Sequence, residues 1–352
     1  MKRVKRACHH LLRTRTGDDI AIKHERHILR VAVAGIHDTV PQIILRVGAV
    51  DVDRLLRARN HDRLPGVLNH IAERRRAVGH GVRAVQYNKP VIAVIVIYYR
   101  TRYQPPMLQV HVAGIYGPVI ITGSQLPIGE VRTDGEENLI TALQIAAAKD
   151  PDGSGPMVRE VAILFENYLW RGNRSTKRSA DNFNAFKSHN YPALAKIGLG
   201  IHFEPKALAR PAAGTTLHPM YEMNPAVVVI DLYPGLDART LDHLLNTPGI
   251  RGVILRTYGA GNGPTDRWFM DCIKNGVGRG LAILNVTQCG NGGVHATRYV
   301  GGEMLSSIGV VSGHDLTFEA AITKMMFLLA QDLTTTQLRY RLAIPLCGEM
   351  SY

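Results

Sequence analysis

The feature that most constrains the fold is a regular alternation of apolar runs with amphipathic stretches in the second half of the chain. Runs of strand length that are apolar except for one polar or charged residue near the end lie at 227–232, 252–256 and 281–286, and stretches with helical periodicity lie at 237–246, 265–275 and 317–329. Strands that are buried on both faces have continuous apolar sequences, because neither side of the sheet meets water. The pattern therefore predicts a small parallel sheet covered by helices on both faces.

The middle of the chain shows the same alternation. An apolar strand at 119–122 ends in a glycine turn, a helix at 136–148 ends before the helix-breaking sequence Asp-Pro-Asp-Gly at 150–153, and a further strand is expected at 161–165. At 352 residues, the chain is long enough for two domains of ~150 residues each. We therefore predict an α/β protein in which a linker at 205–225 joins two domains, 116–204 and 226–352.

Charge separates the first third of the chain from the rest. Residues 1–117 contain 21 Lys and Arg against 8 Asp and Glu, which accounts for the whole net charge of +13, and they hold 9 of the 15 His residues. Such asymmetry is typical of a nucleic-acid-binding or membrane-surface arm. The basic residues do not lie on one helical face, however, and there are few aromatic residues between them to stack on bases. Nucleic-acid binding through this third is the alternative hypothesis.

The four cysteines and the hydropathy pattern indicate the compartment. Cys8, Cys272, Cys289 and Cys347 show neither C-x-x-C pairing nor the spacing of a metal site, which is typical of a reduced, cytoplasmic protein. No run reaches the ~18 apolar residues of a membrane span, and no signal-peptide core follows the first ten residues. We expect no membrane segment and no metal or organic cofactor.

Two loops at predicted strand ends carry candidate chemistry. The first, 171–177 (RGNRSTK), follows the strand at 161–165 and is followed by Ala-Asp-Asn-Phe at 180–183. Ligands of open α/β sheets bind at such strand ends. The second, 259–263 (GAGNG), resembles a dinucleotide-binding turn, but Pro264 breaks the G-x-G-x-x-G pattern, so that signal is weak.

These loops and four further segments resemble the L-asparaginase family, in particular the cytoplasmic bacterial type, over residues 116–352. The matching segments, in the order of the family, are 117–125 (GPVIITGSQ), 132–135 with Asn138 and Leu139, 171–183, 255–262 (LRTYGAGN), 287–289 (TQC) and 316–320 (LTFEA). The resemblance implies a two-domain architecture with a larger N-terminal α/β domain, here incomplete, and a smaller C-terminal domain with a parallel sheet. It also implies hydrolysis of L-asparagine to L-aspartate and ammonia by a homo-oligomer with sites between subunits.

The resemblance assigns roles to five residues. Lys177 matches the lysine of a Thr-Lys-Asp relay that assists a threonine nucleophile, and such a lysine must be neutral to accept a proton. Asn262 matches the residue that a neighbouring subunit contributes to the substrate site. Thr176, Arg256 and Cys289 match an allosteric asparagine pocket, in which the planar fork of Arg256 suits a carboxylate.

Each of these residues also has a plainer explanation. Lys177 can belong to an ordinary basic loop, and Asn262 can serve only as a turn residue between glycines. Arg256 can be a surface salt-bridge partner, and Cys289 a small buried side chain.

Residues 1–115 do not match the family, and we hypothesise that they are translated from the opposite strand of a related gene. Read backwards through complementary codons, residues 90–78 permit a sequence containing His-Gly-Thr-Asp-Thr-Met, as in the asparaginase loop. Residues 65–56 likewise permit a sequence ending in Val-Val-Ile-Thr-Gly-Ser-Gln, close to 119–125. On this hypothesis the basic segment is not natively folded, and the apolar run at 91–99 is an inverted polar loop; by composition alone that run would be a buried strand.

The chain lacks the family's remaining motifs. It contains neither Thr-Gly-Gly-Thr, which carries the nucleophile, nor Gly-Thr-Asp, so we identify no nucleophile. We therefore expect no useful amidohydrolase activity from the chain as written. We also expect the N-terminal sheet to lack its central pairing partners.

Overall fold

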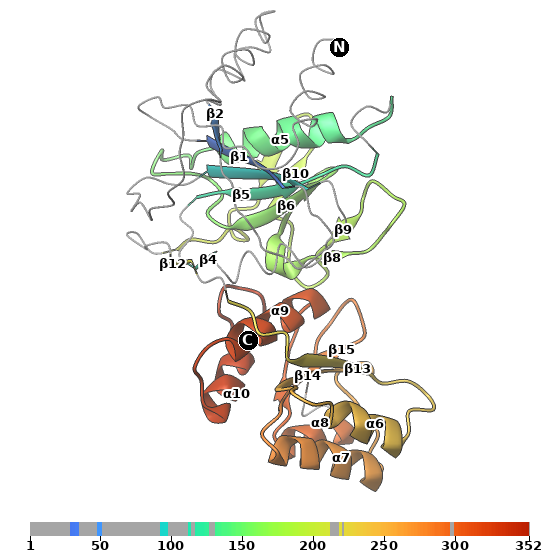
Figure 1. The fold of residues 1–352 in the computed structure, drawn as a ribbon. Coiled ribbons are helices and arrows are strands. Elements are labelled where there is room, and N and C mark those ends of the chain that lie inside the picture. The colour runs from blue at the N-terminus through green and yellow to red at the C-terminus, as the bar shows by residue number, and fades with distance from the viewer. Residues whose placement is uncertain are drawn as a thin grey trace, which may run out of the picture.

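The protein is described by a computed structural model that covers residues 29–34, 48–50, 92–97, 112–113, 117–126, 131–211, 218–219, 222–295 and 299–351. Each of its two larger sheets is packed against helices (Figure 1). The first sheet has eight strands and the second has four. The predicted α/β class and its parallel C-terminal sheet are confirmed.

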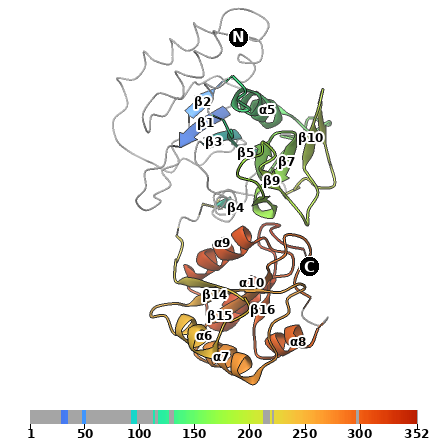
Figure 2. The ribbon, with the colours of Figure 1, turned by 90° about the vertical axis from the view of Figure 1, so that its right-hand side faces the viewer.

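The N-terminal sheet has a parallel centre and antiparallel flanks. Its order is β11-β10-β7-β6-β5-β3-β1-β2, with β1, β3, β5 and β6 parallel. The strands are β1 Leu29–Ala34, β2 Gly48–Val50, β3 Ile92–Ile97, β5 Val119–Thr122, β6 Val161–Phe165, β7 Tyr168–Arg171, β10 Ala195–Ile197 and β11 Ile201–Phe203. Helix α5, Gly135–Ala147, lies across β3, β5 and β6 (Figures 1 and 2).

Strand β3 corrects the expectation that this sheet would lack central partners. It pairs in parallel with β5, from Ala93 opposite Val119 to Val96 opposite Thr122, and β1 pairs with its other edge. An uncharged, β-branched run has the composition of a strand buried on both faces, which explains the pairing. Apart from β1, β2, β3 and β4 (Val112–Ala113), residues 1–115 lie outside the described residues, so the proposed origin of the segment stays a hypothesis.

The core between α5 and the sheet is apolar and closed. Ile120 on β5, Ile145 on α5 and Leu164 on β6 are fully buried in one cluster. Ala207 and Leu208, within the expected linker 205–225, are buried in the same cluster. Residues 212–217 and 220–221 of that linker lie outside the described residues.

The C-terminal sheet is entirely parallel, in the order β13-β14-β15-β16. Its elements are β13 Val227–Asp231, α6 Ala238–Leu245, β14 Gly252–Thr257, α7 Arg267–Gly278, β15 Ala282–Thr287, α8 Val300–Ser307, β16 Val311–Ser312, α9 Phe318–Leu329 and α10 Thr335–Ala343. On β14, Val253 and Leu255 pack towards α6 and α7, whereas Ile254 packs towards α9. Figure 2 shows these helices on opposite sides of the sheet.

Side chains fix the starts of the C-terminal helices. Asp237 accepts from the Thr240 N–H at 2.7 Å, Thr317 accepts from the Ala320 N–H at 3.1 Å, and Thr334 forms a capping box with Gln337. These caps satisfy backbone donors that have no partner within a helix. The remaining short elements are β4 Val112–Ala113, β12 His218–Pro219, β8 Thr176–Lys177, β9 Phe186–Lys187 and a 3₁₀ turn, Gly172–Arg174.

Candidate functional site

The 3₁₀ turn Gly172–Arg174 leads from β7 to β8 and begins at an arginine fixed in the N-terminal domain. Arg171 Nε lies 2.5 Å from Glu160 Oε2, and Arg171 Nη2 donates to the Ala207 carbonyl at 3.0 Å. Its guanidinium also stacks on the Tyr191 ring, 4.3 Å from the centroid. Arg171 and Glu160 are both buried, so their pairing and added hydrogen bonds offset the loss of hydration.

Strand β8 places Thr176 and Lys177 at the boundary between the domains. β8 pairs with β9, with Thr176 opposite Lys187 and Lys177 opposite Phe186. Lys177 Nζ lies 5.7 Å from the centroid of the Phe186 ring. Thr176 Oγ1 donates to Glu319 Oε1 on α9 at 2.7 Å. Both residues are partly exposed, as a group that meets a ligand must be.

Arg256 lies at the end of β14 and reaches the same helix terminus. Its guanidinium lies 4.8 Å from the centroid of the Phe318 ring, and its Nη1 is 2.8 Å from Asp231 Oδ1. Arg256 Nε is buried and has no hydrogen-bond partner among the described residues. Since Phe318 and Glu319 are consecutive, the first turn of α9 brings Thr176 and Arg256 into one neighbourhood. The salt bridge with Asp231 also agrees with the plainer explanation, in which Arg256 is a surface salt-bridge partner.

Cys289 follows β15 in a loop that contacts the N-terminal domain. Its thiol is free and exposed, and its N–H donates to Thr287 Oγ1 at 3.0 Å. Three residues on, Gly292 exchanges hydrogen bonds with the Asn190 side chain at 2.8 and 2.9 Å. Because Cys289 is exposed, the plainer explanation that it is a small buried side chain is wrong. No hydrogen bond within the described part of the chain joins the Cys289 thiol to Thr176 or Arg256.

Asn262 lies in a tight turn that follows β14 and precedes α7, against the start of α8. Tyr258 and Asn262 exchange backbone hydrogen bonds at 2.9 and 2.8 Å, and Gly261 has φ of +97°. Asn262 Oδ1 is buried without a partner among the described residues. Figure 1 places β8 in the upper domain and α8 at the lower end of the other domain. Lys177 therefore belongs to the N-terminal domain of this chain and Asn262 to its C-terminal domain.

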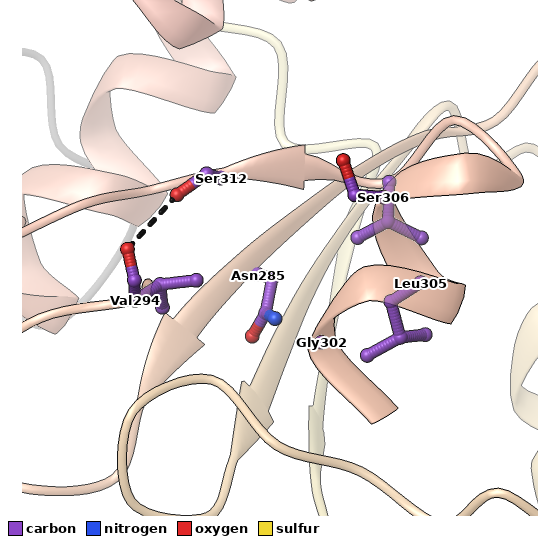
Figure 3. A pocket seen from close by; sticks show the side chains of 7 residues that line it. Asn285, Val294, Gly302, Leu305, Ser306 and Ser312 are labelled. Atoms are coloured by element: carbon purple, nitrogen blue, oxygen red, sulfur yellow. Dashed lines mark hydrogen bonds between the residues drawn. The ribbon is translucent and has the colours of Figure 1, made fainter. Parts of the chain in front are cut away.

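A small cavity lies behind this turn. About 10 Å³ is enclosed by residues of β15, β16 and α8 and by Val294 (Figure 3). Asn285 holds the turn there: its amide donates to the Gly261 carbonyl at 3.0 Å, and its Oδ1 accepts from Thr257 Oγ1 at 2.7 Å. A space of this size holds at most one water molecule, so the cavity is not a substrate site.

Sequence reasoning missed the partners of the predicted residues. Glu319 and Phe318 join Thr176 to Arg256, and Asn285 and Thr257 support the turn of Asn262. Phe318 and Glu319 lie within the motif 316–320, which was a usable signal. Asn285 is a polar residue inside an apolar strand, and only the structure gives the reason. Among the described residues, no group of three or more His, Cys, Asp or Glu side chains could hold a metal ion, and no helix is long and apolar enough to cross a membrane.

Comparison with known proteins matches the chain to two family models. Residues 102–209 match the asparaginase N-terminal domain, and residues 226–341 match the glutaminase/asparaginase C-terminal domain. L-asparaginase 1 of Escherichia coli is 38% identical over 235 residues, which is 66% of this chain and 67% of the relative.

Solved structures agree with this match. L-asparaginase I from Vibrio cholerae has a TM-score of 0.66 at 34% identity, covering 74% of this chain and 76% of that chain. The thermostable L-asparaginase from Thermococcus kodakarensis has a TM-score of 0.66 at 26% identity, covering 92% and 99%. The predicted two-domain architecture is confirmed, and the chain belongs to the asparaginase family of amidohydrolases.

Proposed function

We propose that the chain derives from an L-asparaginase that hydrolyses L-asparagine to L-aspartate and ammonia with a threonine nucleophile. Lys177 is the candidate proton acceptor of the relay. The observation that carries this role is the position of Lys177 on β8, directly after a turn fixed by the buried Arg171–Glu160 pair. A fixed backbone favours this role, because catalytic groups must keep their geometry during the reaction.

We propose that Thr176, Arg256 and Cys289 form an amino-acid-binding allosteric pocket at the start of α9. Arg256 offers a planar fork for a carboxylate, and its present partner Asp231 is 51% exposed. A ligand carboxylate can replace such an exposed partner at little cost, because exposed ion pairs contribute little stability. The unpartnered Arg256 Nε provides a further donor for the ligand.

We propose that Asn262 completes the substrate site of a neighbouring copy in a homo-oligomer. The residue is partly exposed, and its Oδ1 has no hydrogen-bond partner among the described residues. Tyr233 and Tyr258, which follow β13 and β14 at the same sheet edge, are 51% and 39% exposed. Exposed tyrosines with an unsatisfied polar group are typical of a surface that a partner covers.

We further propose that the chain as written has no useful turnover, because it contains neither Thr-Gly-Gly-Thr nor Gly-Thr-Asp. The test is ammonia release from L-asparagine by the purified, sequence-verified chain, with Lys177→Met as the matched variant. We expect both proteins to release ammonia at the buffer rate. Turnover that Lys177→Met abolishes would contradict the inactivity and support the role of Lys177. Turnover that Lys177→Met leaves unchanged would contradict both proposals.

Compartment and cofactor use belong to the same proposal: a cytoplasmic protein without metal or organic cofactor. The alternative, nucleic-acid binding through the basic first third, gains no support from the relatives named above. Phosphate contacts by lysine and arginine would give an affinity that falls steeply with salt. We expect no binding of duplex DNA at low salt, and a steep salt dependence would revive the alternative.

A further inference from the structure

Arg174 is a buried cation whose guanidinium donates only to the other domain among its recorded hydrogen bonds. Its side chain is 3% exposed. Nε donates to the Gly348 carbonyl at 2.9 Å, Nη1 donates to Asp315 Oδ2 at 2.7 Å, and Nη2 donates to Ser351 Oγ at 2.8 Å. One side chain of the N-terminal domain thus binds three separate groups of the C-terminal domain.

These acceptors are held in place by contacts that do not involve Arg174. Lys324 Nζ lies 2.8 Å from Glu349 Oε1, with side chains 0% and 1% exposed, and it donates to the Ile344 carbonyl at 2.6 Å. Glu349 in turn accepts from the N–H groups of Leu346 and Cys347 at 2.8–3.1 Å. Residues 344–351, here called the C-terminal segment, are therefore held against α9 by contacts that do not involve Arg174.

Asp315 joins this segment to the loop before α9. Its Oδ1 accepts from the Ser351 N–H at 2.7 Å, while Oδ2 accepts from Arg174. Burial alone would raise the pKa of Asp315, but the Ser351 N–H and the Arg174 guanidinium outweigh it, and that pKa lies below its usual value. The carboxylate therefore stays charged at neutral pH and binds Arg174 as an ion.

The turn that carries Arg174 is tied to both domains. Arg171 binds Glu160 and Ala207 in the N-terminal domain, whereas Asn173 Nδ2 donates to the Cys347 carbonyl at 3.1 Å. Ser175 Oγ closes the turn by donating to the Gly172 carbonyl at 3.1 Å. Thr176 and Lys177 follow immediately, so their positions depend on where Arg174 is held.

We propose that Arg174 is a positioning residue, which couples the C-terminal segment to β8 and so sets the place of Thr176 and Lys177. The coupling does not depend on turnover by this chain. Hydrogen exchange can therefore contradict the coupling while the proposed function stands, and the ammonia assay can contradict the proposed function while the coupling stands. Asp315 and Ser351 are its partners in the C-terminal domain. The signature of the coupling is local: weakening it frees β8, β9 and the C-terminal segment while the eight-stranded and four-stranded sheets stay intact.

Hydrogen exchange of the full chain, read by mass spectrometry, tests the coupling in Arg174→Gln. Charged hydrogen bonds contribute enough to change a local opening equilibrium by a factor of about 10–100. We expect exchange to rise by about that factor at β8, at β9 and in the C-terminal segment, with β14 and β15 unchanged. Ser351→Ala removes only one acceptor and is expected to give a smaller rise at the same places.

The matched control is Arg159→Gln, which removes another buried arginine that is paired with an aspartate, Asp150, within the N-terminal domain. It should leave β8 and the C-terminal segment at their original exchange rates. Equal acceleration of β14 and β15 in Arg174→Gln would show a merely structural role and overturn the proposal. Unchanged exchange at β8 in both Arg174→Gln and Ser351→Ala would overturn it as well.

Discussion

Lys324 and Glu349 form an ion pair in the interior of the C-terminal domain. Burial lowers the pKa of Lys324, and the nearby Glu349 carboxylate offsets this only in part. Burial alone would raise the pKa of Glu349, but Lys324 and the N–H groups of Cys347 and Leu346 outweigh it, and the pKa falls below 4.5. Each charge is tolerated because the other is present, so the pair orders the chain end more than it adds stability.

This ion pair predicts how the free energy of unfolding depends on pH. The sign of that dependence should reverse when Lys324 is replaced by Met. With a folded pKa below 4.5, Glu349 contributes stability that is present above pH 4.5 and lost as pH falls through the folded pKa. In Lys324→Met, burial has no cation to oppose it and raises the pKa of Glu349. The contribution of Glu349 is then fully present below pH ~4.5 and lost as pH rises through the raised folded pKa.

Urea unfolding between pH 3 and pH 7 measures the difference between the variant and the original chain. Lys324→Met should cost about 3–5 kcal/mol at pH 7 and less at pH 3. Lys274→Met, on the exposed face of α7, should keep the original pH slope and change stability by less than about 0.5 kcal/mol. A loss for Lys324→Met that is equal at pH 3 and pH 7 would contradict the linkage.

At the scale of elements, the sequence was informative where a segment is long and strongly patterned. Strands β5, β6, β13, β14 and β15 and helices α5, α6, α7 and α9 lie where they were predicted, within a few residues at their ends. The two- to four-residue strands from β7 to β11 were not predicted, nor were α8 and α10. The short strands carry too few residues for a period, and their state is decided by tertiary contacts. Helices α8 and α10 are as long as α6, but their apolar residues are less clearly confined to one face.

The candidate site follows the same division. Thr176, Lys177, Arg256 and Asn262 were proposed because each lies in a motif. Arg256 lies near the end of β14, as expected, but Thr176 and Lys177 lie on β8 of a separate two-stranded sheet and not in a loop directly after β6. Glu319, Arg174 and Asp315 were not assigned, because each acts on a residue about 140 positions away in the sequence. The periodicity of a short sequence window carries no information about a contact between residues so far apart in the chain.

The close approach of α8 to the turn at 258–262 gives a prediction at the scale of elements. A Cβ on Gly301, in the first turn of α8, would overlap Asn262 Oδ1 and lie 2.5 Å from the Gly263 carbonyl oxygen. Gly301→Ala should therefore displace the Asn262 turn and cost about 1–3 kcal/mol in thermal unfolding. Gly278→Ala, at the end of α7, meets nothing within 4 Å and should be neutral or stabilising by up to about 1 kcal/mol. Equal melting temperatures for the two variants would refute the close approach.

At the scale of the whole molecule, the chain combines an asparaginase fold with a first third that carries none of the family's motifs. Residues 102–209 and 226–341 match the two family domains, and all of the net charge lies in residues 1–117. An uncharged, β-branched run such as β3 has the composition of a strand and can pair with β5 whichever DNA strand encodes it. The pairing of β3 with β5 is therefore compatible with the antisense hypothesis, whose test lies in the nucleotide sequence.

The antisense hypothesis predicts that the junction between the inverted and the forward sequence lies within the codons for residues 111–122. Long-read sequencing of the locus and its transcript should show the complementary strand of codons 90–78 encoding His-Gly-Thr-Asp-Thr-Met. If the corrected forward frame continues upstream through that motif into Thr-Gly-Gly-Thr, the restored protein should hydrolyse asparagine, since nucleophile, aspartate and Lys177 would then occur in one chain. If the inverted junction is present in the transcript, the chain is the true product, and the absence of turnover follows from its missing nucleophile. Complementary codons that encode neither motif would end the antisense hypothesis and leave the basic third as a segment with an origin of its own.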